Sequence, residues 1–369
     1  MSLRVLVLHN LDFDESAAPS GGAETSDLDV GVAARAEVAG VARAVSDALV
    51  ERKAAVHLRA VRSVGEVVQA VRQFAADVVF NLCESLSGDA RYESSVAAIL
   101  ERLGVPYTGS RAQCLRLCLN KQACGEVLRR AGVPVPEAVL IDEQLDVPPK
   151  LGWPLILKPN SEDGSTGIWS SSVVRGPGAY AEALARLRAA GLAPVIAQRY
   201  VEGREINVAL LGEQPRRLLP INEIDFAEMP AELPRIVSYE CKWIDGTSEW
   251  RGARVVPAEL EPATARAVAR LARAAAEAVG MGSYGRVDFR IDAQGRPWVV
   301  DVNPNCALAP DAGFATSATR ASLSYADLIA TIVEAAIDQR SWPEPARVVP
   351  SRRGPRLVPA ASLPLPVPV

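Results

Sequence analysis

The sequence feature that most constrains the fold is an alternation of short apolar runs with helical segments over residues 3–83. Each apolar run is long enough for one buried strand, and the segments between them repeat their apolar residues with the period of a helix. Strands and helices that alternate in this way form βαβ units around a parallel sheet. We expect strands over 3–10, 55–61 and 77–83 and helices over 33–54 and 64–75.

Composition excludes several classes of protein. The 369 residues are 49% hydrophobic and 23% charged, with a net charge of −4. This is typical of a soluble protein of two or three domains, and it offers no basic excess for binding nucleic acid. No segment is long enough to span a bilayer, and the N-terminal apolar run is too short for a signal peptide. We therefore expect a cytoplasmic protein with neither nucleic acid nor a membrane as a partner.

The histidines and cysteines exclude further chemistry. With two histidines and no CxxC spacing among six cysteines, the chain shows no zinc-type cluster and no basis for a histidine-based triad. The cysteines lie in apolar or helical contexts, which indicates reduced thiols. The first expected strand is not followed by G-x-G-x-x-G, so a nicotinamide-dinucleotide fold has no support.

Residues 11–31 carry six acidic residues and no basic one. A solvated loop and a lid that prefers a cationic substrate are both consistent with this composition. The acidic residues are Asp12, Asp14, Glu15, Glu24, Asp27 and Asp29.

A possible phosphate site follows a Pro-rich connector that ends an expected helix over 111–132. In "WPLILKPNSEDGSTGI" a strand presents Lys158, Pro159 ends the strand, and a loop of small residues follows. Such loops let backbone N–H groups approach a phosphate, and the hydroxyls of Ser165 and Thr166 add donors. An ordinary hairpin turn is the alternative interpretation.

The segment "PVIAQRYVEGREINVALLG" reads as two strands joined by a short connector. The backbone of "QRYV" could hydrogen-bond a planar base, and Glu205 could accept from ribose hydroxyls. A plain hairpin with a surface glutamate is the alternative. A loop-rich stretch, "YECKWIDGTSEW", and a helix rich in alanine over 262–280 follow.

A hairpin is expected over residues 285–305, "GRVDFRIDAQGRPWVVDVNPN". If "DAQG" forms a four-residue turn, Ile291 opposes Arg296 and Asp288 opposes Val299. One face would then be apolar and the other polar, because side chains alternate along a strand and opposed residues share a side of the sheet. Val287, Phe289, Ile291, Trp298, Val300 and Val302 would form the apolar face, and Arg286, Asp288, Asp301 and Asn303 the polar face.

Oxygen ligands on one face suit Mg²⁺, which is usually held by one or two carboxylates together with substrate phosphates. A solvated polar face is the alternative, but Asp and Asn are poor residues for the middle of a strand. The hairpin therefore favours a metal site at Asp288, Asp301 and Asn303.

Taken in order, these blocks resemble the ATP-grasp superfamily and, within it, the D-alanine–D-alanine ligase family. The resemblance covers roughly residues 3 to 338. It implies an α/β protein in which an N-terminal parallel-sheet domain is followed by two α+β subdomains that enclose ATP. The blocks that carry the resemblance are "DVVFNLCE", "LERLGVPYTGS", "LNKQACGEVLRRAGVPVP", the Lys158 strand with its glycine loop, "EGREINVALLG", "SYECKW", "GRVDF" and "DVNPN".

The resemblance also implies domain limits. An N-terminal α/β domain would occupy 1–112, a small central ATP-grasp subdomain 113–200, and a C-terminal ATP-grasp subdomain with the metal site 201–342. Residues 343–369 are Pro-rich and basic without helical or strand period, so we expect a disordered or extended tail. The family's tendency to dimerise implies a possible homodimer.

Roles for individual residues follow from the resemblance. Arg286 would stabilise the charged oxygen of a tetrahedral intermediate, with Ser165 as a second catalytic residue. Asp288, Asp301 and Asn303 would bind two Mg²⁺ ions, which Mn²⁺ could replace. Glu205 would bind the ribose of ATP. The other expected ATP ligands are Lys121, Lys158, Gly164, Ser165, Thr166, Gln198, Tyr200, Val201 and Lys242.

The implied reaction is an ATP-dependent carbon–nitrogen ligation in which a carboxylate is phosphorylated to an acyl phosphate and an amine then attacks it. Such catalysis is mainly positioning and electrostatics, so no protein nucleophile is needed.

The substrate half departs from the family pattern. Cys83-Glu84 stands where the family usually has His-Gly, and "NPNCALAPDAGFATSA" replaces the stretch that binds a terminal carboxylate. The acidic loop replaces the first glycine-rich loop, and Glu37 is the nearest counterpart of its amine-binding glutamate. Glu84, Asp311 and Gly313 are further candidates for substrate contacts.

These departures predict amino-acid or peptide substrates other than two D-alanines. The amine-side substrate would be larger than alanine, cationic, or masked at its carboxylate. A true D-alanine–D-alanine ligase, a carboxylating or thiol-ester-forming ATP-grasp enzyme, and a non-catalytic nucleotide-binding subunit remain as alternatives.

Overall fold

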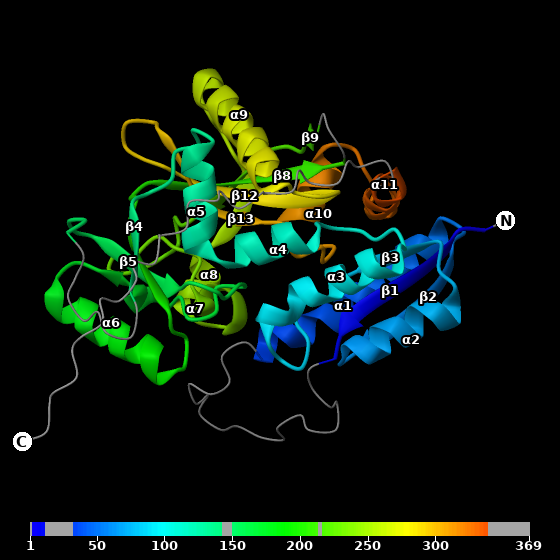
Figure 1. Cartoon of the computed structure of the whole chain (residues 1–369). Helices are drawn as coiled ribbons and strands as arrows, with labels where there is room; N and C mark the ends of the chain where they lie inside the picture. The colour runs from blue at the N-terminus through cyan, green and yellow to red at the C-terminus, as the bar shows by residue number, and fades with distance from the viewer. Residues whose placement is uncertain (1, 12–31, 142–149, 213–215, 339–369) are drawn as a thin grey trace, which may run out of the picture.

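The computed structural model describes residues 2–11, 32–141, 150–212 and 216–338 (Figure 1). Its N-terminal part confirms the expected alternation, with a parallel sheet in the order β2-β1-β3. The elements of this part are β1 (Arg4–Asn10), α1 (Val32–Glu51), β2 (Ala55–Val61), α2 (Val64–Phe74), β3 (Val78–Asn81), the 3₁₀ turn η3 (Ala90–Tyr92) and α3 (Glu93–Leu103). Apart from Leu11, the acidic loop at 11–31 lies outside the described residues, as does the C-terminal tail at 343–369.

The prediction of one helix over 111–132 is wrong, because the structure has two helices there. They are α4 (Ala112–Leu119) and α5 (Lys121–Arg130). Asn120 separates them with an extended backbone (φ −86°, ψ 94°), and its side chain accepts from the backbone N–H of Ala123 at 2.9 Å as the N-cap of α5. The break places Lys121 at the first turn of α5.

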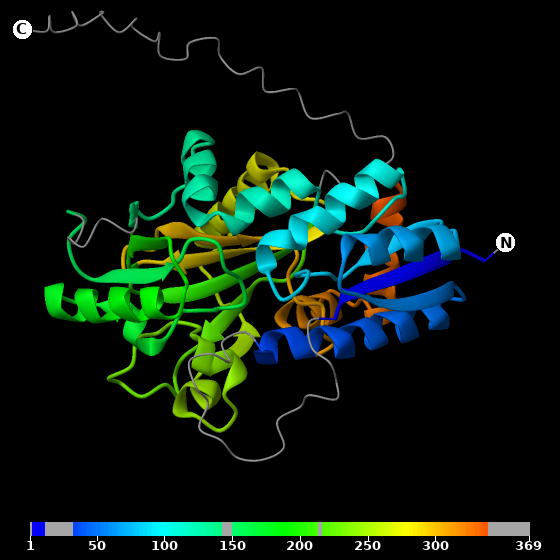
Figure 2. The same ribbon diagram turned by 60° about the horizontal axis from the view of Figure 1, so that its bottom comes forward.

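A four-stranded antiparallel sheet follows, in the order β4-β7-β5-β6. Lys158 lies on β5, and the helix α6 packs against that strand (Figure 2). The elements are β4 (Ala138–Ile141), β5 (Leu155–Pro159), η4 (Ser170–Ser172), β6 (Val173–Val174), α6 (Pro177–Ala189) and β7 (Val195–Arg199).

The next strand begins a second antiparallel sheet, so residues 195–211 do not form a hairpin. This sheet has the order β11-β10-β8-β12-β13, with β9 paired to β8, and α9 packs against it. The elements are β8 (Arg204–Leu211), β9 (Arg217–Leu218), β10 (Asn222–Asp225), α7 (Tyr239–Trp243), α8 (Ser248–Gly252), β11 (Arg254–Pro257), α9 (Pro262–Val279), β12 (Tyr284–Ile291) and β13 (Pro297–Asn303).

The expected register of the β12–β13 hairpin is wrong, although its polar face is as predicted. The turn holds five residues, since Asp292 N–H donates to the carbonyl of Arg296 at 3.1 Å, and Ile291 opposes Pro297. A bulge next to Asp288 then brings Asp288 opposite Asp301.

The bulge also changes the apolar face. Phe289 pairs with Val299, which is buried in the core, whereas Val300 has no Cα partner on β12. Trp298 and Val300 are only partly buried and lie outside that core. Val300 is thus an extra residue in β13, and the number of residues in the turn could not predict it.

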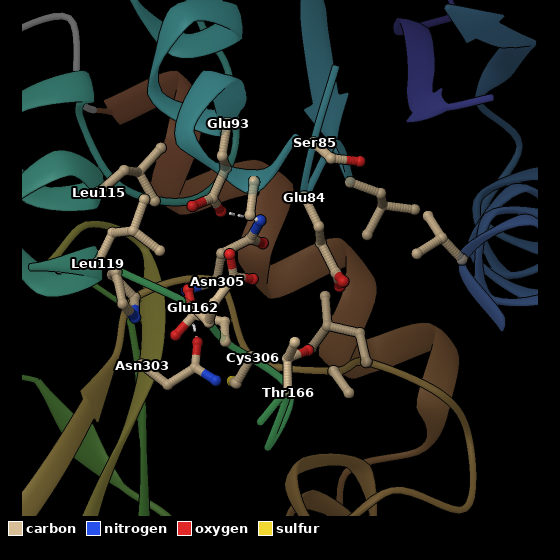
Figure 3. Close-up of a pocket in the computed structure, with 18 of the residues that line it drawn as sticks. Glu84, Ser85, Glu93, Leu115, Leu119, Glu162, Thr166, Asn303, Asn305 and Cys306 are labelled. Atoms are coloured by element: carbon tan, nitrogen blue, oxygen red, sulfur yellow. Dashed lines mark hydrogen bonds between the residues drawn. The ribbon is translucent and has the colours of Figure 1, made fainter. Parts of the chain in front are cut away.

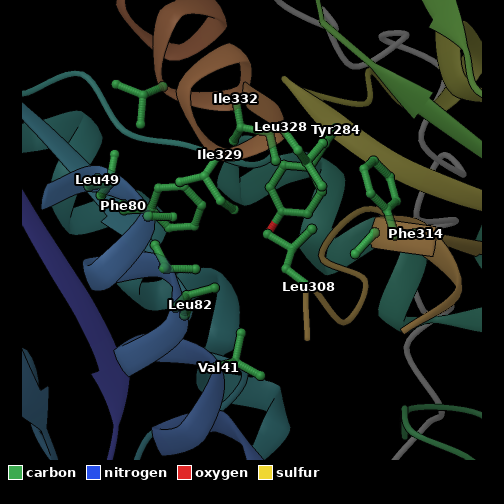
Figure 4. Close-up of a cluster of buried hydrophobic side chains, with 14 of the residues drawn as sticks. Val41, Leu49, Phe80, Leu82, Tyr284, Leu308, Phe314, Leu328, Ile329 and Ile332 are labelled. Carbon is green, nitrogen blue, oxygen red and sulfur yellow. The ribbon is translucent and has the colours of Figure 1, made fainter. Parts of the chain in front are cut away.

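One apolar cluster joins the N-terminal sheet to the C-terminal helices α10 (Gly313–Arg320) and α11 (Tyr325–Asp338), as Figure 4 shows. Phe80 of β3 and Ile329 of α11 belong to this cluster and are fully buried. Tyr284 and Phe314 meet edge to face with centroids 5.9 Å apart, a contact that contributes about 1 kcal/mol beyond burial. The cluster therefore fixes the N-terminal part against the sheet that carries β12.

Two further expectations concern the whole chain. No helix among the described residues is long and apolar enough to cross a membrane. All six cysteines are free thiols, and five of them are buried. The domain limits proposed from the sequence stay a prediction.

Candidate active site

Two cavities of similar size adjoin one another. One, of about 350 Å³, lies between the two antiparallel sheets, and we call it the inter-sheet cavity. The other, of about 340 Å³, lies between the N-terminal part and the segment after β13, and we call it the acidic cavity. Both are lined by Glu162, Asp163, Gly164, Lys242, Arg286 and Asn303, so these residues mark where the cavities meet.

Three lysines from separate elements line the inter-sheet cavity: Lys121, Lys158 and Lys242. Lys158 Nζ lies 3.4 Å from the carbonyl oxygen of Val300, the extra residue of the bulge. Burial lowers the pKa of Lys158 to about 8. Lys121 pairs with Asp163 at 3.6 Å, and although burial opposes its charge, Asp163 and Asp301 raise its pKa. Clustered cations of this kind are suited to a polyphosphate.

The glycine loop that follows β5 is hydrogen-bonded to the segment that carries Lys242. Trp243 Nε1 donates to the carbonyl of Gly164 at 2.9 Å, and the backbone N–H of Tyr239 donates to Ile168 at 2.6 Å. Ser165 Oγ donates to the carbonyl of Val237 at 2.9 Å, so its hydroxyl fastens the loop. These hydrogen bonds fix α7 against the glycine loop and thereby hold Lys242 at the junction of the two cavities.

A buried arginine that the sequence reasoning missed organises the other end of the inter-sheet cavity. Arg290, only 4% exposed, donates to the carbonyl of Val201 at 3.0 Å and to Glu205 at 3.0 Å. It also donates to the hydroxyl of Tyr200 at 3.1 Å and to the carbonyl of Arg235 at 2.6 Å. Burial raises the pKa of Glu205, and the charge of Arg290 counteracts it. One guanidinium therefore fixes the residues expected to meet adenine and ribose.

The polar face of β12 and β13 carries Arg286, Asp288, Asp301 and Asn303. Arg286 holds Asp288 by two hydrogen bonds, at 2.7 and 2.8 Å. Asn207 Nδ2, from β8, donates to Asp288 at 2.7 Å.

The carboxylate of Asp301 accepts no hydrogen bond within the part of the chain that the structure describes. This open carboxylate, beside Asp288 and the amide of Asn303, fits a hard cation that also binds phosphate. No group of three His, Cys, Asp or Glu side chains suited to a metal occurs among the described residues. Ligands from a substrate would thus be needed to complete a metal site.

The acidic cavity has a different chemistry (Figure 3). Glu84, Glu93, Glu162 and Asp163 line it together with apolar side chains such as Leu115 and Leu119. Glu93 begins α3 and is 7% exposed, and Asn305 Nδ2 donates to its Oε1 at 2.7 Å. Burial raises the pKa of Glu93 well above its usual value, and the charge of Asp163 adds to this effect.

The remaining sequence candidates do not lie in one place: some line one of the two cavities and others do not. Gly313 lines the inter-sheet cavity, where its carbonyl accepts from Asn222 at 2.8 Å. Asp311 is exposed and is not among the described residues that line either cavity. Glu37 falls in α1, but its side chain lies outside what the structure describes. Thr166 lines the acidic cavity, and Gln198 lines the inter-sheet cavity.

Sequence reasoning missed four residues of the site, namely Asn207, Arg290, Glu93 and Asn305. Asn207 lies within the apolar run of β8, and Arg290 continues the polar alternation of Arg286 and Asp288 along β12, so these patterns could have marked them. Glu93 and Asn305 had no comparable signal, because they meet only through the tertiary fold.

Two antiparallel sheets that enclose a lysine-lined cavity, next to an N-terminal parallel sheet, define the ATP-grasp class of ATP-dependent ligases. The solved structure of D-alanine–D-alanine ligase from Bacillus anthracis complexed with ATP has the same fold, with a TM-score of 0.69. It is 19% identical in sequence, and the match covers 92% of this chain and 99% of that one.

Sequence comparison defines the family. The model of the family described as "D-ala D-ala ligase C-terminus" matches residues 128–334, more than half of the chain. The D-alanine–D-alanine ligase of Chromohalobacter salexigens is 31% identical over 273 residues, 73% of this chain and 81% of that protein. The uncharacterized protein y4sG of Sinorhizobium fredii is 31% identical over 259 residues, 70% of this chain and 74% of its own. The chain belongs to the D-alanine–D-alanine ligase family and is an ATP-dependent ligase.

The pair of Arg290 with Glu205 yields a first prediction. Arg290→Met leaves a buried carboxylate without its cation, which should lower the free energy of unfolding by about 3 kcal/mol and weaken ATP binding. Glu205→Gln in the same chain removes that uncompensated charge. The double variant should therefore lose less free energy of unfolding than the two single variants lose when their losses are added. Urea unfolding of the four proteins measures this coupling. Additive losses would show that the pair carries no coupling energy.

The lowered pKa of Lys158 yields a second prediction. Its positive charge is lost as pH rises through about 8, so ATP affinity should fall over the same range. Lys158→Arg keeps the charge and should flatten the profile. Burial also lowers the pKa of Lys242, so some slope should remain in that variant. Calorimetric titration with ATP across this range measures both profiles, and wild-type affinity that does not fall above pH 8 would contradict the assignment.

Proposed function

We propose that this ligase joins the carboxylate of one amino acid or peptide to the amine of another, and that at least one of the two is not D-alanine. The reaction forms an acyl phosphate from the first substrate and ATP, and the amine then displaces phosphate from the acyl carbon. Both steps require neutralisation of developing charge more than a protein nucleophile.

The observation that carries this proposal is the junction of the two cavities at Lys242, Arg286 and Asn303. A γ-phosphate held by the lysines of the inter-sheet cavity would lie next to an acid bound in the acidic cavity. Arg286 keeps its charge at any working pH and lies at this junction, so it can stabilise an oxyanion on the acyl carbon.

Asp288, Asp301 and Asn303 are the residues that would hold Mg²⁺ at this junction, with phosphate oxygens completing its coordination. The metal would offset the charge of the phosphates during transfer. Asp301 has no competing donor among the described residues, whereas Asp288 is already held by Arg286 and Asn207. We infer that Asp301 contributes the more available ligand.

The adenosine part of ATP would lie against the backbone from Gln198 to Val201, with Glu205 at the ribose. Tyr200 N–H already donates to the carbonyl of Pro154 at 3.0 Å, so this amide contributes to the sheet and is not a donor to adenine. The Arg290 guanidinium keeps Glu205 beside the cavity.

The substrate proposal rests on the lining of the acidic cavity. A second D-alanine needs cationic or N–H-rich surroundings for its free carboxylate. The acidic cavity instead has four acidic and two basic side chains in its lining. Both basic ones lie at the junction with Glu162 and Asp163, whereas Glu84 and Glu93 lie away from it. An acidic surface repels a free carboxylate and attracts ammonium and guanidinium groups.

The experiment that tests the function is ADP release over pairs of amino acids of both configurations, followed by mass spectrometry of the product. We expect an amide product from at least one pair and weak turnover with D-alanine alone. If D-alanine alone gives the highest kcat/KM and its dipeptide, the substrate proposal is wrong and the usual family activity holds. If no amine raises ADP release, the ligation proposal itself fails.

The metal assignment yields a third prediction. Asp301→Asn should abolish turnover and leave thermal unfolding nearly unchanged, because a neutral amide binds Mg²⁺ weakly and the side chain is not used in the fold. Asp47→Asn, at an exposed position of α1, is the matched control and should keep full activity. Turnover of the Asp301→Asn variant near the wild-type rate at ordinary Mg²⁺ concentration would remove Asp301 from the metal site.

A further inference from the structure

The ammonium group of Lys242 makes no hydrogen bond and no ion pair within the part of the chain that the structure describes. It nevertheless lines both cavities at their junction. A lysine side chain is a flexible four-carbon stem, so without a partner it takes its place from the backbone that carries it. The position of this charge therefore depends on what fixes the segment between β10 and β11.

That segment, residues 226–253, leaves the second antiparallel sheet after β10 and returns to it at β11. It carries α7 and α8, which pack on each other (Figure 1). Its apolar side chains form a small cluster around Phe226 and Met229, separate from the larger cores. A segment with so few buried apolar groups needs polar contacts with the rest of the protein to keep one orientation.

Two sets of hydrogen bonds supply these contacts. One set joins the segment to the glycine loop and includes the bond from Trp243 Nε1 to the carbonyl of Gly164. The other set meets at the carbonyl of Arg235, which accepts from Arg290 Nη1 at 2.6 Å and from the Tyr200 hydroxyl at 3.3 Å. Arg290 lies on β12, between β8 and β13, so this second anchor is fixed to a strand inside the sheet and not to a loop.

The same nitrogen of Arg290 serves the end of the cavity expected to bind ribose. Nη1 donates to Glu205 Oε2 at 3.0 Å as well as to the carbonyl of Arg235. Nε donates to the carbonyl of Val201, and Nη2 donates to the hydroxyl of Tyr200. Because the guanidinium is planar and all three of its nitrogens have partners, it cannot turn without breaking several of these bonds.

We propose that Arg290 is a positioning residue that holds Lys242 in place for the γ-phosphate of ATP by fixing the carbonyl of Arg235. This inference rests on the proposed function, in which Lys242 is one of the lysines that hold the γ-phosphate, and it names a further residue for that role. Since all three nitrogens of Arg290 bind protein groups, its effect on the phosphate passes through the segment that carries Lys242.

The test compares the binding of ADP with that of β,γ-methylene-ATP, an analogue that cannot transfer its γ-phosphate, by calorimetry in the presence of Mg²⁺. The ratio of the two dissociation constants reports on contacts to the γ-phosphate, and its measurement needs no amino-acid substrate. We expect wild-type protein to prefer the analogue, and Lys242→Ala to lower that preference about tenfold because a charged hydrogen bond is lost.

Arg290→Lys keeps the positive charge but cannot reach four acceptors, so it should remove most of the same preference. Glu205→Gln should weaken both nucleotides equally, because both carry ribose, and should leave the ratio unchanged. Arg296→Lys is the matched control, because Arg296 pairs with Asp292 at the exposed turn of the same hairpin. It should change neither dissociation constant.

The double variant of Arg290→Lys with Lys242→Ala identifies the route of the effect. If Arg290 acts through Lys242, the double variant should lose no more preference than Lys242→Ala alone. Losses that add would overturn the inference, and so would an Arg290→Lys variant that weakens ADP and the analogue equally. If Arg290→Lys does not fold, Tyr200→Phe replaces it, because it removes the second donor to the Arg235 carbonyl and keeps the buried cation. It should also lower the preference, and an unchanged ratio would reject the role of this anchor.

These outcomes are distinct from those that test ligation. Amide formation together with an unchanged ratio in Arg290→Lys would leave the proposed function standing and overturn the positioning role. A lowered ratio in a protein that joins no pair of amino acids would support the positioning role and overturn ligation. Equal binding of ADP and the analogue by wild-type protein would show that Lys242 does not hold the γ-phosphate, and it would overturn this inference as well.

Discussion

The pairing of β12 with β13 is the constraint on which the rest of the site depends. One side of these strands is buried against α9 through Val287, Phe289 and Val299, so their register is fixed by the core. The other side must then present Arg286, Asp288, Asp301 and Asn303 together. The charges are tolerated because Arg286 and Asn207 bind Asp288 and because the charges of Lys121, from α5, and Lys158, from the facing sheet, act on Asp301.

The two cavities differ in the charged side chains of their linings although they share lining residues. Lysines from α5, β5 and α7 surround the inter-sheet cavity, whereas carboxylates from α3, the end of β3 and the glycine loop surround the acidic cavity. A polyphosphate would then lie on the lysine side of a boundary that runs through Arg286 and Lys242. An anionic intermediate formed at this boundary would meet the cations of the junction and be kept from the acidic side.

The sequence predicted the parts of this arrangement that follow from local pattern. The alternation of apolar runs with helical segments was enough to predict the parallel sheet. The alternation of polar and apolar residues along β12 and β13 was enough to predict their polar face. The break at Asn120 was missed because the sequence was read as one continuous helix, and only the capping geometry of Asn120 separates the two helices. The bulge at Val300 was missed because a hairpin of any register has alternating faces, and the core decides which one forms.

Contacts between distant segments could not be predicted from periodicity, and Asn305 shows why they matter. Its backbone N–H donates to Asn303 Oδ1 at 3.1 Å, its side chain donates to Glu93, and its Oδ1 accepts from Tyr284 at 2.7 Å. Tyr284 is in turn packed on Phe314 in the cluster that joins the N-terminal part to the C-terminal helices. The same asparagine thus connects the polar face of β13, the buried carboxylate of the acidic cavity and the core between them. A ligand that moved Glu93 would therefore also act on the orientation of Asn303, because Asn305 is hydrogen-bonded to both side chains.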